Sequence, residues 1–126
     1  MKILLVDDDA FLRDMYASKF ISSGHDVLVA DSSATTLSRF QNGETFDLLI
    51  LDMVMPGTSG VELLTLINQQ FAGAINHCIF LSNQGQDEDI KEAKDAGAIG
   101  YIVKAHSIPS EVVEKVESII KSATKS

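Results

Sequence analysis

The sequence is short of cysteine, proline and long hydrophobic runs, and it contains no tryptophan. Its one cysteine, Cys78, cannot form a disulfide within the chain, which is typical of proteins in a reducing compartment. Because Cys78 opens an apolar run, we expect a buried side chain rather than a reactive thiol. No segment approaches the roughly 20 apolar residues of a membrane-spanning helix, and the N-terminus lacks the pattern of a signal peptide. These absences favour a cytoplasmic protein that does not associate with membranes.

Positive charge is also scarce, since 10 Lys and Arg residues face 18 Asp and Glu residues and give a net charge of −8. Contacts with nucleic-acid phosphates need clustered Lys and Arg side chains, so we expect no direct binding of nucleic acid and favour proteins as partners. A hydrophobic content of 45% with only two prolines excludes a disordered chain. The length of 126 residues is that of one folded domain.

The three histidines, His25, His77 and His106, lie at the ends of predicted elements. None has a cysteine or a second histidine at the spacing of a zinc site. We therefore expect all three at the surface rather than in a metal centre.

Five short apolar runs recur along the chain, at residues 3–6, 27–30, 48–51, 78–81 and 99–103. Segments with helical spacing follow them, as in the stripe after the first run formed by Leu12, Met15, Tyr16 and Phe20. Continuous apolar runs are typical of parallel strands buried on both faces. Five strand–helix repeats predict an α/β fold in which right-handed crossovers cover both faces of a parallel sheet.

Capping residues predict where several helices begin. Asp9 is suited to cap the first helix, Ser59 and Glu62 form a capping-box pattern before the third, and Pro109 fits the first turn of the last. The fourth helix is expected to begin at Asp87, and its nearly polar sequence predicts the least firm packing.

No linker rich in Gly, Ser or Pro divides the chain, and no internal repeat is present. We expect one domain over residues 1–122, a short tail over 123–126 and no output domain.

Carboxylates end two of the predicted strands. Asp7 and Asp8 follow the first apolar run, and Asp52 follows the third. Because open parallel sheets bind ligands at the carboxyl ends of their strands, we expect these three acids to meet in one pocket. Like charges at close range repel, so such a pocket requires a cation, and Mg²⁺ prefers hard oxygen ligands. The sequence predicts a Mg²⁺ site with one carboxylate free to react.

Two further polar residues end the fourth and fifth strands, Ser82 and Lys104. A nucleophilic carboxylate, a metal, an ammonium and a hydroxyl donor together suit phosphoryl transfer. Each residue also has a simpler interpretation. Asp8 is suited to a helix N-cap, Lys104 to a solvated strand end, and Ser82 to an ordinary loop.

Taken together, the polar residues resemble those of a response regulator receiver domain in order and spacing, over the whole length of the chain. The matching residues are Asp7, Asp8, Asp52 before Met53-Val54-Met55-Pro56-Gly57, Ser82, Tyr101 and Lys104. The resemblance implies a flavodoxin-like, doubly wound fold of five helices around a five-stranded parallel sheet of order 2-1-3-4-5.

The resemblance also implies roles for the acids. Asp52 would accept a phosphoryl group from a histidine kinase or phosphotransfer protein. Asp8, Asp52 and the backbone carbonyl of Val54 would bind Mg²⁺ directly, and Asp7 would act through water. Asp9 matches no role in the family.

Three more residues take roles by the same resemblance. Lys104 would pair with the phosphoryl group, Ser82 would hydrogen-bond to it, and Tyr101 would turn inward behind Ser82. Two positions depart from the family pattern. Ala105 stands where proline usually follows the lysine, often after a cis peptide bond, and Asn83 stands where a very small residue usually opens the pocket.

The leading hypothesis is a stand-alone receiver that switches protein–protein interactions through the face of its fourth helix, fifth strand and fifth helix. We expect it to turn over no external substrate. We expect a monomer. The alternative is a phosphate-independent interaction module of the same fold. An enzyme is a third option, either an aspartyl phosphatase or a flavin carrier. It is disfavoured because no second acid lies two residues after Asp52 and no flavin phosphate loop follows the first strand.

Overall fold

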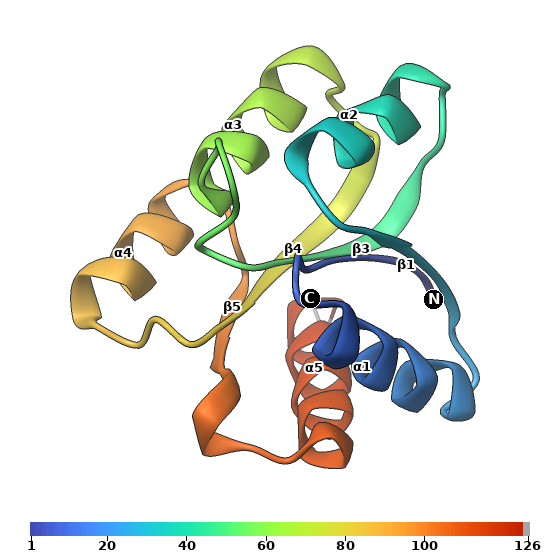
Figure 1. Cartoon of the computed structure of the whole chain (residues 1–126), viewed down its shortest axis with the longest axis vertical. Coiled ribbons are helices and arrows are strands. Elements are labelled where there is room, and N and C mark those ends of the chain that lie inside the picture. Colours follow the sequence, from blue (N-terminus) through green and yellow to red (C-terminus); the bar gives the residue numbers. More distant parts are fainter. Residues whose placement is uncertain (125–126) are drawn as a thin grey trace.

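The computed structural model describes residues 1–124, in which strands and helices alternate along the chain (Figure 1). The strands are β1 (Lys2–Val6), β2 (Asp26–Ala30), β3 (Phe46–Leu51), β4 (Ile75–Ser82) and β5 (Gly100–Val103). The helices are α1 (Ala10–Ser22), α2 (Ser33–Gln41), α3 (Gly60–Gln70), α4 (Asp87–Asp95) and α5 (Pro109–Thr124), with a short 3₁₀ turn at Lys104–His106.

The strands form one parallel sheet of order β2-β1-β3-β4-β5. Helices α1 and α5 cover one face, and α2, α3 and α4 cover the other (Figure 1). The predicted α/β class and the strand order implied by the resemblance are both confirmed. This arrangement gathers the carboxyl ends of all five strands, and the loops that follow them, at one edge of the molecule.

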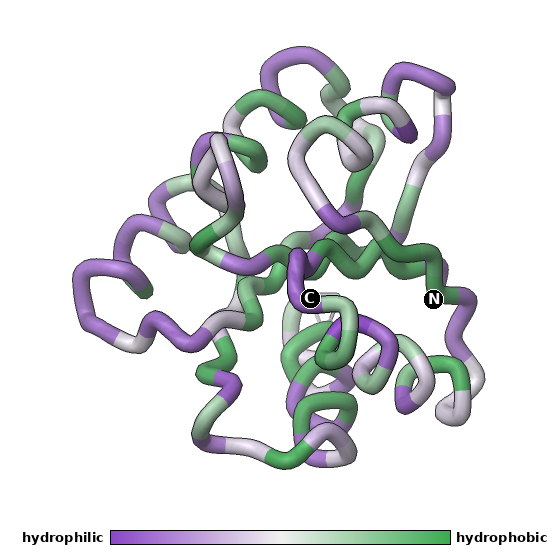
Figure 2. Tube along the Cα trace, viewed as in Figure 1, coloured by the Kyte–Doolittle hydropathy of each residue, from purple (hydrophilic) through white to green (hydrophobic). Residues whose placement is uncertain are grey.

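Burial on both faces explains the continuous apolar runs. In β1 and β3, Leu4 and Leu49 pack toward α2 and α3, while Ile3 and Ile50 pack toward α1 and α5. Figure 2 shows the hydrophobic strands through the centre and hydrophilic residues on the outer turns of the helices. Two core layers therefore enclose the sheet and fix the strand ends.

The predicted caps Asp9 and Ser59 form their bonds, but within residues 1–124 Glu62 returns none to Ser59, so the predicted capping box is only half formed. The Asp9 carboxylate accepts the Leu12 backbone N–H at 3.0 Å, and the Ser59 hydroxyl accepts that of Glu62 at 3.2 Å. Helix α4 begins at Asp87, as expected, and buries a single residue. Its weak packing agrees with its polar sequence.

Several boundaries differ from the expected ones. β4 begins at Ile75, three residues before its apolar run, because Ile75 pairs with Phe46 of β3. Helix α5 continues through Thr124, so residues 123 and 124 of the predicted tail are helical, and residues 125–126 lie outside the described part.

Every peptide bond in the described chain is trans. Nor does any described helix have the length and apolar content needed to cross a membrane.

The surface prediction was wrong for His25, whose side chain is only 11% exposed. Its ring packs edge-on against Phe20, and Nε2 lies 3.0 Å from Oε2 of Glu117. The C-terminal end of α1 and the body of α5 enclose it. His106 is exposed, as expected, and His77 is half-buried.

Candidate functional site

Three acids meet at the carboxyl ends of β1 and β3. These strands are neighbours, with Val6 opposite Leu51, so the residues that follow them lie side by side. Carboxylate oxygens of Asp7, Asp8 and Asp52 lie within 4.8 Å of one another. Asp7 and Asp52 are buried and Asp8 is exposed, so the cluster opens to solvent on one side.

Lys104 supplies the positive charge in this pocket. It follows β5 directly, and its Nζ donates to Oδ2 of Asp7 at 2.6 Å and to Oδ2 of Asp52 at 2.9 Å. Burial lowers the pKa of Lys104, but its hydrogen bonds to the two carboxylates and their charges outweigh that effect and hold the pKa above its ordinary value. The side chain is therefore a buried, charged bridge between the two strand ends.

The Asp52 carboxylate is held by three donors. Lys104 binds Oδ2, while Oδ1 accepts the Ser82 hydroxyl at 2.8 Å and the Val54 backbone N–H at 3.1 Å. Three donors on a largely buried carboxylate fix its orientation. Ser82 is the last residue of β4, so its hydrogen bond ties the end of that strand to Asp52.

A chain of hydrogen bonds links this carboxylate to β5. The Gln84 backbone N–H donates to the Ser82 hydroxyl at 3.3 Å, and the Tyr101 hydroxyl donates to the Gln84 carbonyl. The Tyr101 ring is stacked on Phe80, with centroids 6.1 Å apart. Burial raises the pKa of Tyr101, so its hydroxyl remains a donor at neutral pH.

Two residues of the site were not assigned by sequence reasoning. Gly60, the first residue of α3, donates its N–H to the Met53 carbonyl at 2.9 Å, and a Cβ at Gly60 would lie 2.1 Å from the carbonyl oxygen of Asp52. Arg13 of α1 donates from Nη1 to the Asp7 carbonyl at 3.2 Å. Gly60 lies between Ser59 and Glu62 of the predicted capping-box pattern, whereas nothing in the sequence pattern singled out Arg13.

Exposed apolar side chains lie in the segments that follow three of the strands. Phe11, Val54 and Ile108 are 76%, 57% and 61% exposed, and each lies in a segment that follows a strand end. Asn83, which follows Ser82, is also exposed. Large apolar groups at this edge of the sheet suit contact with another protein.

The donor set fits a hard divalent cation. Mg²⁺ takes oxygen ligands, usually one or two carboxylates, and keeps several waters. Asp8 is exposed and makes no ion pair with Lys104, whereas Asp7 and Asp52 share its ammonium. A cation in this pocket therefore competes with Lys104 for two of the three carboxylates.

Comparison with known proteins gives consistent matches. Residues 3–117 match the response regulator receiver domain family. The chemotaxis protein CheY of Halobacterium salinarum is 31% identical over 119 residues, which are 94% of this chain and 96% of that protein. The transcriptional regulatory protein ResD of Bacillus subtilis is 31% identical over 124 residues, 98% of this chain, but the chain spans only 50% of its length. A solved structure of Vibrio cholerae chemotaxis protein CheY4 is 26% identical, covers 94% of this chain and 97% of its own, and superposes with a TM-score of 0.84.

Proposed function

The chain belongs to the response regulator receiver domain family of two-component systems, and we propose that Asp52 accepts a phosphoryl group from a histidine kinase or phosphotransfer protein. Receivers of this family interact with such donors and with output partners, and they are not known for turnover of substrates. The observation that carries the proposal is the setting of Asp52, a largely buried carboxylate between a lysine, a hydroxyl and two further acids.

In the proposed reaction, a carboxylate oxygen of Asp52 attacks the phosphorus of a phosphohistidine. The new P–O bond forms as the P–N bond breaks, and its electron pair returns to the imidazole nitrogen, which then takes a proton. Lys104 and Ser82, which already contact Asp52, donate to the phosphoryl oxygens as negative charge spreads over them. These three residues are the ones to which we assign the chemistry.

We assign the metal site to Asp8, Asp52 and the backbone carbonyl of Val54, with Asp7 acting through water. Bound Mg²⁺ would supply positive charge opposite the phosphoryl oxygens. The exposed Asp8 carboxylate is free to turn toward the ion, while the buried Asp7 is already paired with Lys104 and would reach the ion only through water.

We place the output surface on α4, β5 and α5. Two observations support this choice. Helix α4 buries only Ala93, so little packing resists its movement, and the bonds through Ser82 and Gln84 connect Asp52 with Tyr101 of β5. When the Ser82 hydroxyl leaves Asp52 for a phosphoryl oxygen, the Gln84 segment and Tyr101 must adjust. The proposed switch works as a cytoplasmic monomer.

Phosphorylation of the full chain with acetyl phosphate, followed by mass spectrometry, tests the proposal. We expect label on Asp52 alone, and only when Mg²⁺ is present. Asp52→Asn removes the acceptor, and Asp47→Asn is a matched control because Asp47 is an exposed acid on β3, the strand that Asp52 follows. Label on another residue, or undiminished label in Asp52→Asn, contradicts the assignment.

A further inference from the structure

Strand β2 forms an open edge of the sheet, because its only neighbour is β1. The Ala30 carbonyl faces β1 and accepts the Asp7 N–H at 3.1 Å. Since the backbone groups of alternate residues point to opposite sides of a strand, Val27 and Val29 direct their N–H and carbonyl groups outward. Both valines are only half-buried. An edge of this kind is a ready template for another strand.

Arg39 of α2 partly covers this edge. Its Nη2 donates to the Val29 carbonyl at 3.1 Å, and its Nη1 donates to the Glu44 carboxylate at 3.3 Å. Within residues 1–124, no side chain or loop bonds to the N–H of Val27 or Val29. Among the described residues, the Arg39 side chain has no hydrogen-bond partners besides Val29 and Glu44, and it is 30% exposed, so it can be displaced.

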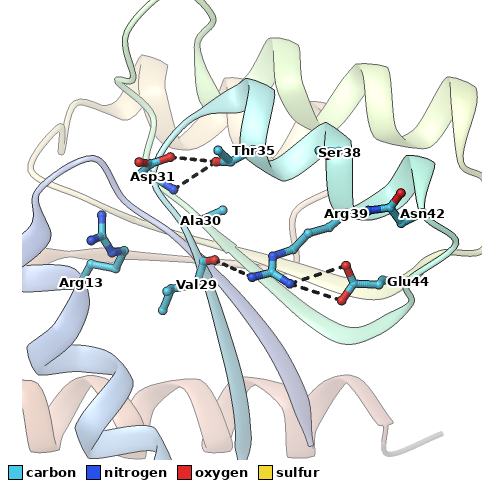
Figure 3. Close-up of a pocket in the computed structure, with 9 residues that line it drawn as sticks. All are labelled: Arg13, Val29, Ala30, Asp31, Thr35, Ser38, Arg39, Asn42 and Glu44. Atoms are coloured by element: carbon cyan, nitrogen blue, oxygen red, sulfur yellow. Dashed lines mark hydrogen bonds and ion pairs between the residues drawn. The ribbon is translucent and has the colours of Figure 1, made fainter.

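A groove of about 460 Å³ lies at the carboxyl end of this edge, where Val29, Ala30 and Asp31 line it (Figure 3). Figure 3 shows Arg13 of α1 on one side of β2 and Arg39 of α2 on the other. The Nε of Arg13 is buried without a hydrogen-bond partner in the described residues, and it lies 3.8 Å from Oδ1 of the exposed Asp14, a weak ion pair that an incoming carboxylate would have to replace. Asp31 and Glu44 also line the groove, so two cations face two acids and the lining has no net charge.

These features select the kind of occupant. A neutral lining does not concentrate a small, highly charged ion, whereas unpaired backbone donors and acceptors recognise another main chain. We propose that the β2 edge binds an extended segment of a partner protein by strand addition, that the segment displaces Arg39 from the Val29 carbonyl, and that one of its acidic side chains pairs with Arg13. The net charge of −8 on each copy opposes pairing with a second copy of this chain.

Sheet geometry also specifies the pattern of the segment. Successive side chains of an added strand point to opposite faces. Those on the α1 side would meet Val27, Val29 and Arg13, and those on the α2 side would meet the half-buried Leu28. The expected partner sequence therefore alternates and carries its carboxylate on the α1 side. This binding is separate from phosphorylation of Asp52.

The test uses the full ¹⁵N-labelled chain and a blocked peptide in which valine and threonine alternate around one glutamate. Peptide binding should protect the Val27 and Val29 amides from hydrogen exchange. A control peptide with alternate backbone nitrogens methylated should not bind. Arg39→Ala should tighten binding about fivefold, because the peptide no longer displaces a hydrogen bond. Lys91→Ala, on the distant helix α4, should leave binding unchanged.

A mutant cycle tests the pairing with Arg13. Arg13→Ala should weaken binding of the glutamate peptide but not of its glutamine analogue. Phosphorylation of Arg39→Ala by acetyl phosphate serves as a folding check that does not depend on the peptide. The proposal is overturned if the Val27 and Val29 amides stay unprotected in both the native chain and Arg39→Ala. Concentration-dependent dimerisation of Arg39→Ala that protects these amides without peptide would also overturn it, by identifying a second copy as the occupant.

Discussion

Replacing Lys104 with methionine should destabilise the metal-free protein strongly. The ammonium contacts Asp7 at 2.6 Å and Asp52 at 2.9 Å, and the three side chains are 5%, 2% and 12% exposed. Methionine keeps most of the aliphatic packing but leaves two buried carboxylates without their shared cation. Removing one partner of a buried ion pair costs about 3–5 kcal/mol, a large share of the roughly 5–15 kcal/mol that stabilises a domain. The melting temperature should fall by roughly 10–20 °C.

The shift in melting temperature on adding Mg²⁺ is a second test of the role of Lys104. In the native chain a cation must compete with Lys104 for Asp7 and Asp52, whereas in Lys104→Met it has no competitor. A ligand that binds only the folded state raises stability by mass action. Millimolar Mg²⁺ should therefore raise the melting temperature of both proteins, and raise that of Lys104→Met more. Asp8→Ala should reduce the shift in either background.

The pH dependence follows from the raised pKa of Lys104. A group whose folded pKa lies above its unfolded value of 10.5 stabilises the fold fully below that value, and the contribution is lost only as pH rises through the folded pKa. The stability difference between the native chain and Lys104→Met should thus be the same at about pH 7 and about pH 9. Urea unfolding measures it, with the exposed Lys91→Met as control. If Lys104→Met lowers the free energy of unfolding by less than about 1 kcal/mol, the value of a surface ion pair, the buried bridge is refuted.

Three other predictions concern the switch and its support. On beryllofluoride binding, amide exchange should change most between residues 82 and 110, and changes confined to α3 would contradict the proposed output surface. Val54→Asn should speed loss of phosphate from Asp52, because an amide can hold the attacking water and an apolar side chain cannot, while Gln84→Ala should slow that loss only modestly. The decay of labelled phosphate measures both rates. If Val54→Asn loses phosphate no faster and Gln84→Ala loses it much more slowly, Gln84 controls the lifetime. Gly60→Ala should cost at least about 1–3 kcal/mol in urea unfolding, because its Cβ would overlap the Asp52 carbonyl at 2.1 Å, and native stability would refute that contact.

The sequence by itself determined the elements and the position of the acid pocket. Strands buried on both faces must be continuously apolar, so their ends are visible where Asp7 and Asp52 begin. Helix caps are equally local, since Asp9 and Ser59 bond to backbone groups only three residues away. Such features depend on neighbouring residues and on the rule that parallel strands share a carboxyl edge.

Other features were decided only by the tertiary structure. The first residues of β4 include the polar Asn76 and His77, and they become a strand because β3 offers them a pairing partner. His25 is largely enclosed because α1 packs beside α5 and brings Glu117, 92 residues away, to its ring. Arg39 covers the Val29 carbonyl because β2 is an edge strand. Local patterning specifies which residues are buried, but the partner that a polar side chain finds depends on how distant elements are placed by packing of the whole core.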